Sequence, residues 1–315
     1  MTNFILWRKD RLLNLVQIQT TSICNGRCIC CPYKESWYMK NPGYMSDELY
    51  EKILNDIVEY DPKFSGKFCP YLCNEPFADK KIVERTEMAY NILDNPFMEL
   101  STNCELMTPD KTDAIYDIYK KHNFYGNFGL SHHGIDKKSF EHNMGIDYDK
   151  SIKNMIYFLQ KFDGKMRIGI QDMAYSLDQK FRMNPYRAVD RYLNKLIDDN
   201  GINRHNLILS PKVFHNRAGN VHTDGWDYQK IIRKIDDRNP FDCLRATRCL
   251  HVIYTGEIIG CCMDYYNETI SGDLTQMTVK EYFDSGNYEE WKDMVRGKLE
   301  SSENFICKRC MSPGG

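Results

Sequence analysis

Apolar and polar residues follow two alternating patterns along the first 214 residues of the chain. The stretch 15–21 (LVQIQTT) alternates residue by residue, as a strand does. The stretch 46–60 has apolar residues at helical spacing after Ser46, a residue type that caps helices. The two patterns predict strands at 15–21, 63–73, 97–103, 127–134, 166–172 and 206–214, and helices at 46–60, 79–93, 108–122, 149–162 and 185–199.

This alternation favours an α/β fold in which parallel strands are joined by crossover helices. The alternation ends with the last of these strands. A polar stretch at 219–240, with room for a short helix, then indicates a domain boundary near 220–240. The remaining pattern predicts a hairpin at 251–262, turning at Thr255–Gly256, and a helix at 278–299 that is broken at Ser285–Gly286.

The charge of the chain argues against two classes of partner. Its 315 residues carry 42 Lys and Arg against 44 Asp and Glu, a formal net charge of -2 at pH 7. This balance provides no excess of positive charge for binding nucleic acid, and the sequence has no run of basic residues that would indicate binding to a membrane surface. No apolar stretch is long enough to span a bilayer, and charge interrupts the apolar N-terminal patch too soon for a signal peptide. We therefore expect a cytoplasmic protein.

The chain has 13 cysteines, and most of them lie in two groups near its ends. In a reducing cytoplasm, clustered thiols indicate metal binding or catalysis rather than disulfides. The early group is Cys24, Cys28, Cys30 and Cys31, and the late group is Cys243, Cys249, Cys261, Cys262, Cys307 and Cys310. Two separate metal sites are therefore predicted.

Cys24, Cys28 and Cys31 form a C-x3-C-x2-C pattern in the loop after the first strand. Three thiolates in one short loop can hold three irons of a four-iron cluster and leave one iron open to a small molecule. A zinc site or ordinary buried thiols are the alternatives. Zinc sites of this kind use C-x2-C pairs with a fourth ligand close by, and the nearest histidine here is His122.

The C-x3-C-x2-C loop resembles the signature loop of radical S-adenosylmethionine (radical SAM) enzymes, which follows the first strand of a partial (β/α)6 TIM-like barrel. The resemblance implies this barrel for residues 1–235, a 4Fe-4S cluster on Cys24, Cys28 and Cys31, and S-adenosylmethionine as a further cofactor. Cys30 stands where that family has an aromatic residue. The spacing favours Cys31 as the third ligand and Cys30 as a bystander.

Three further segments resemble that family in the same order. YLCNEPFAD (71–79) is similar to its Gly-Gly-Glu-Pro-like loop, which implies that Glu75, beside Asn74, accepts a hydrogen bond from the ammonium of S-adenosylmethionine. LSTNCEL is similar to a Ser/Thr-Asn-Gly segment and implies polar cofactor contacts from Ser101 and Asn103. MRIGIQD is similar to the apolar segment on which adenine rests, which implies that role for Ile170.

The late group supplies four thiolates from a hairpin region and a C-x2-C pair, namely Cys243, Cys261, Cys307 and Cys310. Four thiolates fully coordinate a cluster for electron transfer or structure, but a zinc ribbon fits the spacing equally well. Cys249 or Cys262 could replace one of the first two. The C-x12-G-x4-C pattern with its distant C-x2-C resembles the twitch domain, a shortened SPASM domain of radical SAM enzymes. This implies one auxiliary 4Fe-4S cluster in a hairpin-plus-helix domain at 236–315.

The chain is similar over nearly its whole length to the twitch-bearing dehydrogenases of aminocyclitol biosynthesis, the deoxy-scyllo-inosamine type. The segments 130–134 (LSHHG) and 215–220 (HNRAGN) carry this likeness. It implies that a deoxyadenosyl radical, formed by reductive cleavage of S-adenosylmethionine, takes hydrogen from a secondary alcohol of a sugar-like or aminocyclitol-like molecule, while the auxiliary cluster accepts an electron. Arg217 would anchor a substrate oxygen or else fasten the two domains, and His132 or His133 would take the hydroxyl proton.

Two other functions fit parts of the pattern. A peptide- or protein-modifying radical enzyme is one, although a first strand near residue 15 leaves little room for an N-terminal leader-recognition domain. A non-catalytic iron–sulfur carrier is the other, and it gives no role to Glu75 or the polar strand ends. Either enzyme implies a flavodoxin- or ferredoxin-type electron donor and a small-molecule or peptide substrate, without nucleic acid or membrane.

Overall fold

A single sheet organises the computed structural model, with nine strands in the order β6-β5-β4-β3-β2-β1-β7-β8-β9. The structure describes residues 11–172, 185–211, 216–221, 234–236, 238, 240, 241 and 243–310. Neighbouring strands from β6 to β7 are parallel, whereas β7, β8 and β9 are antiparallel. The strands are β1 (Leu15–Ile18), β2 (Lys67–Cys69), β3 (Phe97–Thr102), β4 (Gly126–Ser131), β5 (Arg167–Asp172), β6 (Leu207–Pro211), β7 (Cys249–Val252), β8 (Glu257–Ile259) and β9 (Ile270–Asp273).

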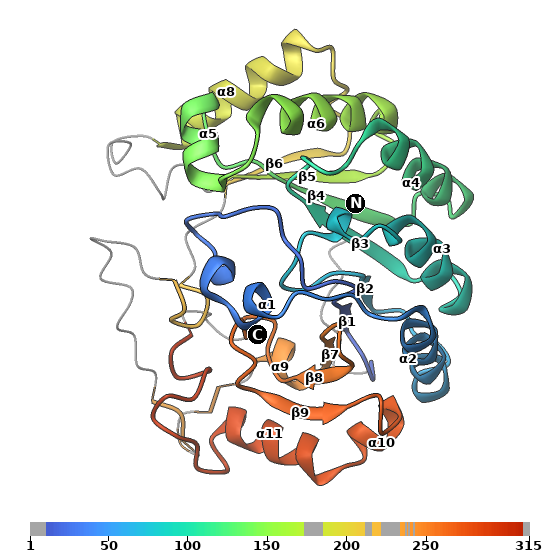
Figure 1. Ribbon diagram of the computed structural model, residues 1–315, viewed down its shortest axis with the longest axis vertical. Coiled ribbons are helices and arrows are strands. Elements are labelled where there is room, and N and C mark those ends of the chain that lie inside the picture. Colours follow the sequence, from blue (N-terminus) through green and yellow to red (C-terminus); the bar gives the residue numbers. More distant parts are fainter. Residues whose placement is uncertain are drawn as a thin grey trace.

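The helices between the parallel strands lie along the outer side of the curved sheet (Figure 1). The longer ones are α2 (Asp47–Tyr60), α3 (Ile82–Ile92), α4 (Pro109–Lys121), α6 (Tyr148–Phe162) and α8 (Pro185–Asp199). Shorter helices are α1 (Trp37–Lys40), α5 (Lys137–Met144) and α9 (Leu244–Thr247), and α10 (Val279–Phe283) and α11 (Gly286–Arg296) follow β9. Local signals fix their ends: the Ser46 hydroxyl accepts a bond from the backbone N–H of Leu49 at 3.1 Å.

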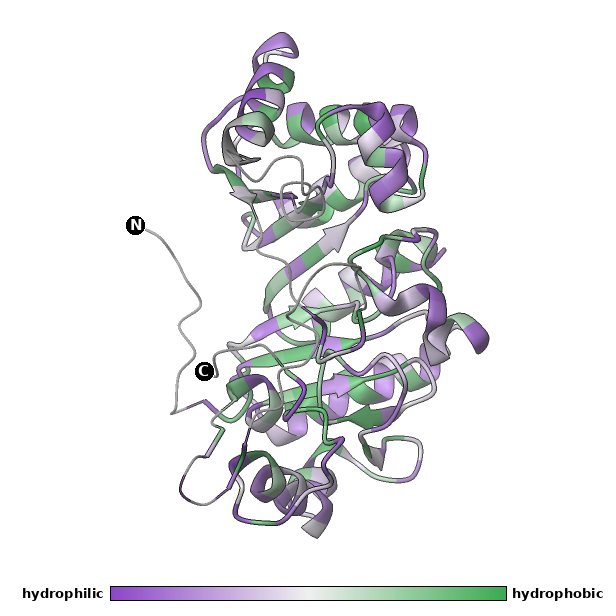
Figure 2. Cartoon of the chain, turned by 90° about the vertical axis from the view of Figure 1, so that its left-hand side faces the viewer, coloured by the Kyte–Doolittle hydropathy of each residue, from purple (hydrophilic) through white to green (hydrophobic). Residues whose placement is uncertain are grey.

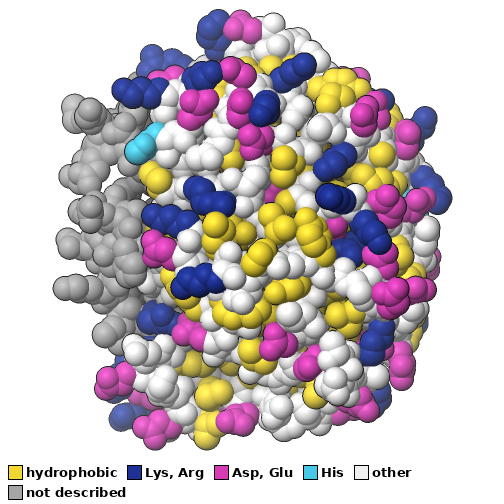
Figure 3. All heavy atoms as spheres, in the orientation of Figure 1, with side chains coloured by type: hydrophobic (Ala, Val, Ile, Leu, Met, Phe, Trp, Pro, Cys, Tyr) yellow, Lys and Arg dark blue, Asp and Glu magenta, His cyan; other side chains and the backbone are white. Residues whose placement is uncertain are grey.

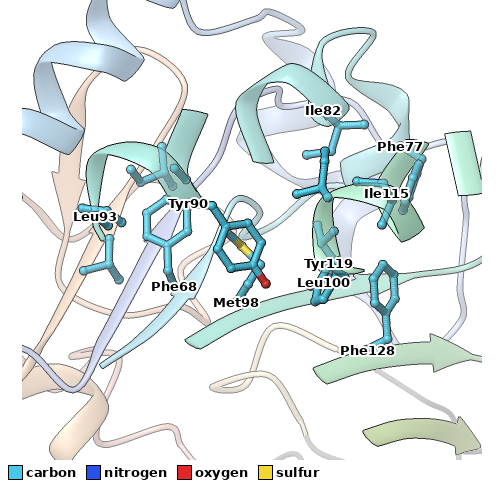
Figure 4. Packing of buried hydrophobic residues seen from close by; sticks show 14 of the residues in the cluster. Phe68, Phe77, Ile82, Tyr90, Leu93, Met98, Leu100, Ile115, Tyr119 and Phe128 are labelled. Carbon is cyan, nitrogen blue, oxygen red and sulfur yellow. The ribbon is translucent and has the colours of Figure 1, made fainter. Parts of the chain in front are cut away.

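The main core fills the space between the sheet and these helices (Figure 4). Phe68, Leu100 and Phe128 from three adjacent strands are buried there. They pack with Tyr90 and Tyr119, whose ring centres are 5.7 Å apart in an edge-on contact. Figure 2 shows the same division in the hydropathy of the chain, because hydrophobic colour follows the central strands and hydrophilic colour the outer helix surfaces. Burial of this apolar surface is what holds the helices on the sheet.

The predicted α/β class, a partial barrel followed by C-terminal strands and helices, is confirmed. The predicted break in the last helical segment is also present, since Ser285 separates α10 from α11. Helix α5 was not predicted. The end of the predicted strand at 212–214, His215 and most of the polar stretch at 219–240 lie outside the described residues.

The sheet continues across the predicted domain boundary. Strand β7 pairs with β1 in parallel register, with Leu15 opposite Cys249 and Ile18 opposite Val252. The division at residues 235 and 236 therefore stays a prediction. Among the helices that the structure describes, none has both the length and the apolar character of a membrane span. Figure 3 shows basic and acidic side chains interspersed over the visible face, without a large patch of one sign.

Candidate functional site

A cavity of about 660 Å³ lies inside the open barrel and is bounded by three parts of the chain. One is the loop 24–31, called the cysteine loop below. The second is the inward face of strands β1 to β6, and the third is the segment 261–265 after β8, called the bridging segment. We refer to this space as the central cavity. Its size is within the range of small-molecule pockets.

The cysteine loop brings Cys24, Cys28, Cys30 and Cys31 to the wall of the central cavity. The loop turns tightly, so that a side-chain carbon at Gly26 would lie 3.6 Å from Cys24 Sγ and 3.5 Å from Cys28 Sγ.

Helix α5, which the sequence did not reveal, holds the loop in place. The backbone N–H of Arg27 donates to the Met144 carbonyl at 2.8 Å, and that of Ile29 donates to the Asn143 carbonyl at 2.9 Å. The Arg27 guanidinium also donates to the Cys24 carbonyl at 2.8 Å. The helix end and the guanidinium together fix the direction of the thiols.

The electrostatics of the cysteine loop suit a cationic inorganic group. Burial and neighbouring thiols raise the pKa of Cys28, and the same causes raise the pKa of Cys30 to about 12. Buried thiols therefore keep their protons unless positive charge is supplied, and iron supplies it. Over the described ranges, no three Cys, His, Asp or Glu side chains converge as they do around a single metal ion.

Four of the six late cysteines share one apolar cluster, which includes neither Cys249 nor Cys262, although the thiol of Cys262 bonds to that of Cys261. The cluster, which also includes Trp291, contains the thiols predicted to bind the auxiliary group: Cys243, Cys261, Cys307 and Cys310. The backbone N–H of Met263 points at Cys261 Sγ at 3.4 Å, as a donor to a thiolate would. Cys249 instead packs with Leu15 and Cys69, and Cys262 turns into the central cavity.

Arg217 lines the central cavity. It lies in a tight turn that contacts both the bridging segment and the C-x2-C region near Arg309. Its backbone φ is +47°, and Ala218 and Gly219 also have positive φ. The turn is tied down by side chains on either side, because Asn216 Nδ2 donates to the Arg309 carbonyl at 3.0 Å and Asn220 Nδ2 to the Met263 carbonyl at 3.3 Å. An arginine in this sparsely populated conformation is held there by its surroundings. The guanidinium donates to Met263 Sδ at 3.5 Å.

Glu75 also lines the central cavity, is 4% exposed, and is held by three donors. Thr102 Oγ1 donates at 2.6 Å, the Asn103 N–H at 2.9 Å and the Phe77 N–H at 3.2 Å. Burial nevertheless raises the pKa of Glu75 to about 7. A ligand cation beside this carboxylate would favour its ionised form.

Beside Glu75, the amide Nδ2 of Asn74 is buried and has no hydrogen-bond partner among the described residues. A buried donor without a partner fits a ligand carboxylate. The pair formed by Glu75 and Asn74 therefore suits the ammonium and carboxylate of an amino acid.

The remaining predicted residues fall into two sets. Ser101 and His133 line the central cavity, and burial lowers the pKa of His133 to about 4, so its imidazole is neutral at pH 7. Asn103 also lines the central cavity and reaches the cysteine loop, where its Nδ2 donates to Asn25 Oδ1 at 2.9 Å. Ile170 and His132 are not brought to the cavity: Ile170 lies in the helix-side core, and His132 stacks on Tyr192 with ring centres 5.3 Å apart.

The barrel interior is polar and partly hollow rather than packed with aliphatic side chains. Glu99, Asn127 and Arg167 occupy matching positions on adjacent strands and line the central cavity. Glu99 accepts bonds from Lys67 Nζ at 2.5 Å and from Tyr71 Oη at 2.9 Å. At the next inward-facing position of β5, two residues after Arg167, a side-chain carbon added to Gly169 would meet only a backbone oxygen, at 3.9 Å. Sequence reasoning missed these residues, although strict alternation along 97–102 places Glu99 and Ser101 on one face.

Two family models match the chain: the radical SAM superfamily over residues 18–171 and the SPASM iron–sulfur cluster-binding domain over residues 243–311. No curated protein matches it. Among solved structures, BtrN in complex with AdoMet and 2-DOIA has a TM-score of 0.60 at 14% identity, with 96% of this chain and 95% of that chain covered. Native anSMEcpe with bound AdoMet has a TM-score of 0.54 at 18% identity, with 89% and 83% covered.

Streptococcus suis SuiB bound to precursor peptide SuiA is a third similar structure, with a TM-score of 0.55 at 13% identity and 95% and 71% covered. At these identities the likeness establishes a common fold. The two matched domains imply S-adenosylmethionine and two 4Fe-4S clusters as cofactors. The open cysteine loop, the Glu75–Asn74 pair and the separate late thiols are consistent with that set. The protein is therefore a radical SAM enzyme whose C-terminal region is a SPASM iron–sulfur domain.

Proposed function

We propose that the protein oxidises a secondary alcohol of a small, hydroxylated molecule such as a sugar or an aminocyclitol. One observation carries the proposal: the bridging segment begins at Cys261, within the late thiol cluster, and its next residues line the same cavity as the cysteine loop. A substrate radical formed in this cavity lies between the two proposed cluster sites. That arrangement suits a reaction in which hydrogen is removed at one site and an electron leaves through the other.

When bound, the cofactors would supply a deoxyadenosyl radical to take a hydrogen atom from the alcohol carbon and an auxiliary cluster to accept the remaining electron, while the hydroxyl proton would pass to a base. The chain's own residues bind and orient the reactants. Glu75 and Asn74 hold the amino acid end of S-adenosylmethionine, as their burial and hydrogen bonding favour. His133 accepts the hydroxyl proton, because it is neutral at pH 7 and lines the cavity.

The wall of the cavity favours a hydroxylated substrate over an aliphatic one. Barrel interiors are ordinarily filled with branched aliphatic side chains. Here the inward positions include Glu99, Ser101, Asn127 and Gln171, with open space at Gly169. Such groups donate and accept hydrogen bonds that a polyol satisfies and that an aliphatic side chain would leave unpaired. Arg217 adds a fork of donors for a substrate oxygen.

The similar structures allow a second candidate. BtrN was solved in complex with 2-DOIA, whereas anSMEcpe was solved with a Cp18Cys peptide and SuiB with a precursor peptide. A peptide- or protein-modifying enzyme therefore remains the alternative to be tested. It differs in its substrate, because it would act on a peptide and leave polyols unchanged.

The test uses anaerobically reconstituted protein with S-adenosylmethionine and dithionite. Polyols, aminosugars and peptides are offered separately, and products are searched by mass spectrometry for a loss of two mass units. An alcohol deuterated at its carbinol carbon should transfer deuterium to deoxyadenosine. His133→Gln should slow alcohol oxidation while leaving cleavage of S-adenosylmethionine, and His142→Gln, on an exposed surface of α5, serves as control. Oxidation of a peptide but no alcohol would overturn the proposal.

A further inference from the structure

The bridging segment makes a direct contact with the cysteine loop through Tyr265. The Tyr265 Oη and Cys31 Sγ atoms are 3.5 Å apart, with the thiol as donor while it carries its proton. Tyr265 is 7% exposed and packs in one apolar cluster with Tyr33 and Cys31. When Cys31 binds iron as a thiolate, it has no proton to donate. The phenol then becomes the donor of this pair.

The backbone around Tyr265 is held by hydrogen bonds on both sides. The Tyr265 carbonyl accepts the backbone N–H of Trp37 at 2.9 Å, which fixes it to the segment after the cysteine loop. The neighbouring Asp264 carboxylate is fully buried and accepts bonds from the Thr269 N–H at 2.8 Å and the Thr269 hydroxyl at 2.6 Å. Tyr38 Oη also donates to the Asp264 carbonyl at 2.9 Å. These bonds fix the chain that carries the phenol, and the ring itself packs against the apolar cluster that includes Tyr33.

The contact distinguishes Cys31 from the other thiols of the loop. Cys28 Sγ points at the Met144 carbonyl at 3.8 Å, and a carbonyl cannot donate a hydrogen bond. Cys24 Sγ has a hydrogen bond with the Gly26 backbone, but among the described residues no side-chain donor to it is found within hydrogen-bond distance. Hydrogen bonds to ligand sulfurs stabilise the more negatively charged, reduced state of an iron–sulfur cluster and so raise its reduction potential.

We infer that Tyr265 is a positioning residue for the first cluster, whose hydroxyl orients the Cys31 ligand and raises the cluster's reduction potential. Tyr265 comes four residues after Cys261 of the late thiol cluster, so one short segment contacts both proposed cluster sites. The inference rests on the ligand roles proposed for Cys31 and Cys261, but not on the identity of the substrate.

The test compares Tyr265→Phe with Tyr266→Phe, a control at the adjacent position, whose side chain is 38% exposed. The reduction potential of the first cluster is measured by EPR-monitored titration without substrate, in protein with matched iron content. Tyr265→Phe should shift the potential to a more negative value and slow deoxyadenosine formation, and Tyr266→Phe should leave both unchanged. Identical potentials in all three proteins would overturn the inference.

A second measurement is needed if Tyr265→Phe fails to retain iron. Unsubstituted protein in D2O should then show an exchangeable deuteron coupled to the reduced first cluster in pulsed EPR spectra. A spectrum without such coupling would contradict the hydrogen bond. Both measurements are made without substrate. A failed search for an alcohol substrate therefore leaves them unchanged, whereas a wrong inference about Tyr265 alters them alone.

Discussion

Replacing Glu75 by Gln removes the negative charge that we assign to the ammonium of S-adenosylmethionine. The carboxylate is almost inaccessible, and Thr102, Asn103 and Phe77 orient it from within the protein. A hydrogen bond to a charged group contributes roughly 1.5–3 kcal/mol, which corresponds to about 10- to 150-fold in affinity. We therefore expect Glu75→Gln to bind S-adenosylmethionine weaker by a factor in that range.

The pH dependence follows from the raised pKa of Glu75, which is about 7 because the carboxyl is buried. Its folded-state pKa lies above the ordinary value, so a proton competes with the ligand ammonium for the carboxylate as the pH falls through 7. Affinity should be roughly eightfold weaker at pH 6 than at pH 7.5, because the ionised fraction falls by about that factor. The Glu75→Gln protein should lose this dependence.

The assay is equilibrium binding of S-adenosylmethionine to anaerobic, iron-loaded protein between pH 6 and pH 7.5. Glu87→Gln is the matched control, because that exposed carboxylate pairs with Lys121 at 3.0 Å, away from the cavity. Its affinity and pH profile should equal those of the unsubstituted protein. Unchanged affinity in Glu75→Gln, or a flat profile in the unsubstituted protein, would refute the role assigned to Glu75.

Three further outcomes are expected. Cys261→Ala should lower iron content from about eight to roughly four atoms per chain, whereas Cys249→Ala, outside the late thiol cluster, should leave it unchanged in chemical analysis. Gly169→Leu should fill open cavity space and reduce turnover of an accepted alcohol on the order of 100-fold, with an unaltered melting temperature. Gly256→Ala should lower the free energy of unfolding by about 1–3 kcal/mol in denaturant titrations. The reason is that Gly256 has φ +100° and an added side-chain carbon would lie 2.8 Å from Thr275. An unchanged denaturation midpoint would contradict this.

The elements that sequence patterns predict well are those with strong local signals. Ser46 caps α2 as its position suggests, and the break at Ser285–Gly286 separates two helices. Helix α5 was missed because its sequence, KKSFEHNM, has few apolar residues and its start depends on the Asp136–Ser139 capping box. Its function is also non-local, since its last residues hold the cysteine loop.

The candidate site shows the same limit of local reasoning. The motif spacing of the cysteines groups Cys261 with the C-x2-C pair but leaves Cys262 as an alternative, and only strand pairing reveals that Cys249 faces Leu15 and Cys69. Ile170 could have been assigned to the core from alternation, because its neighbours Gly169 and Gln171 point to the cavity. The contact between Tyr265 and Cys31 joins residues 234 positions apart and leaves no local signal.

The most direct measurement of the central claim is cleavage of S-adenosylmethionine by the anaerobic protein under dithionite, followed by chromatography of deoxyadenosine. The account predicts that the unsubstituted protein forms deoxyadenosine, and that a variant with Cys24→Ala, Cys28→Ala and Cys31→Ala retains roughly half of the iron and forms none. Intact S-adenosylmethionine in the presence of fully loaded, reduced protein, or zinc in place of iron on the cysteine loop, would contradict it.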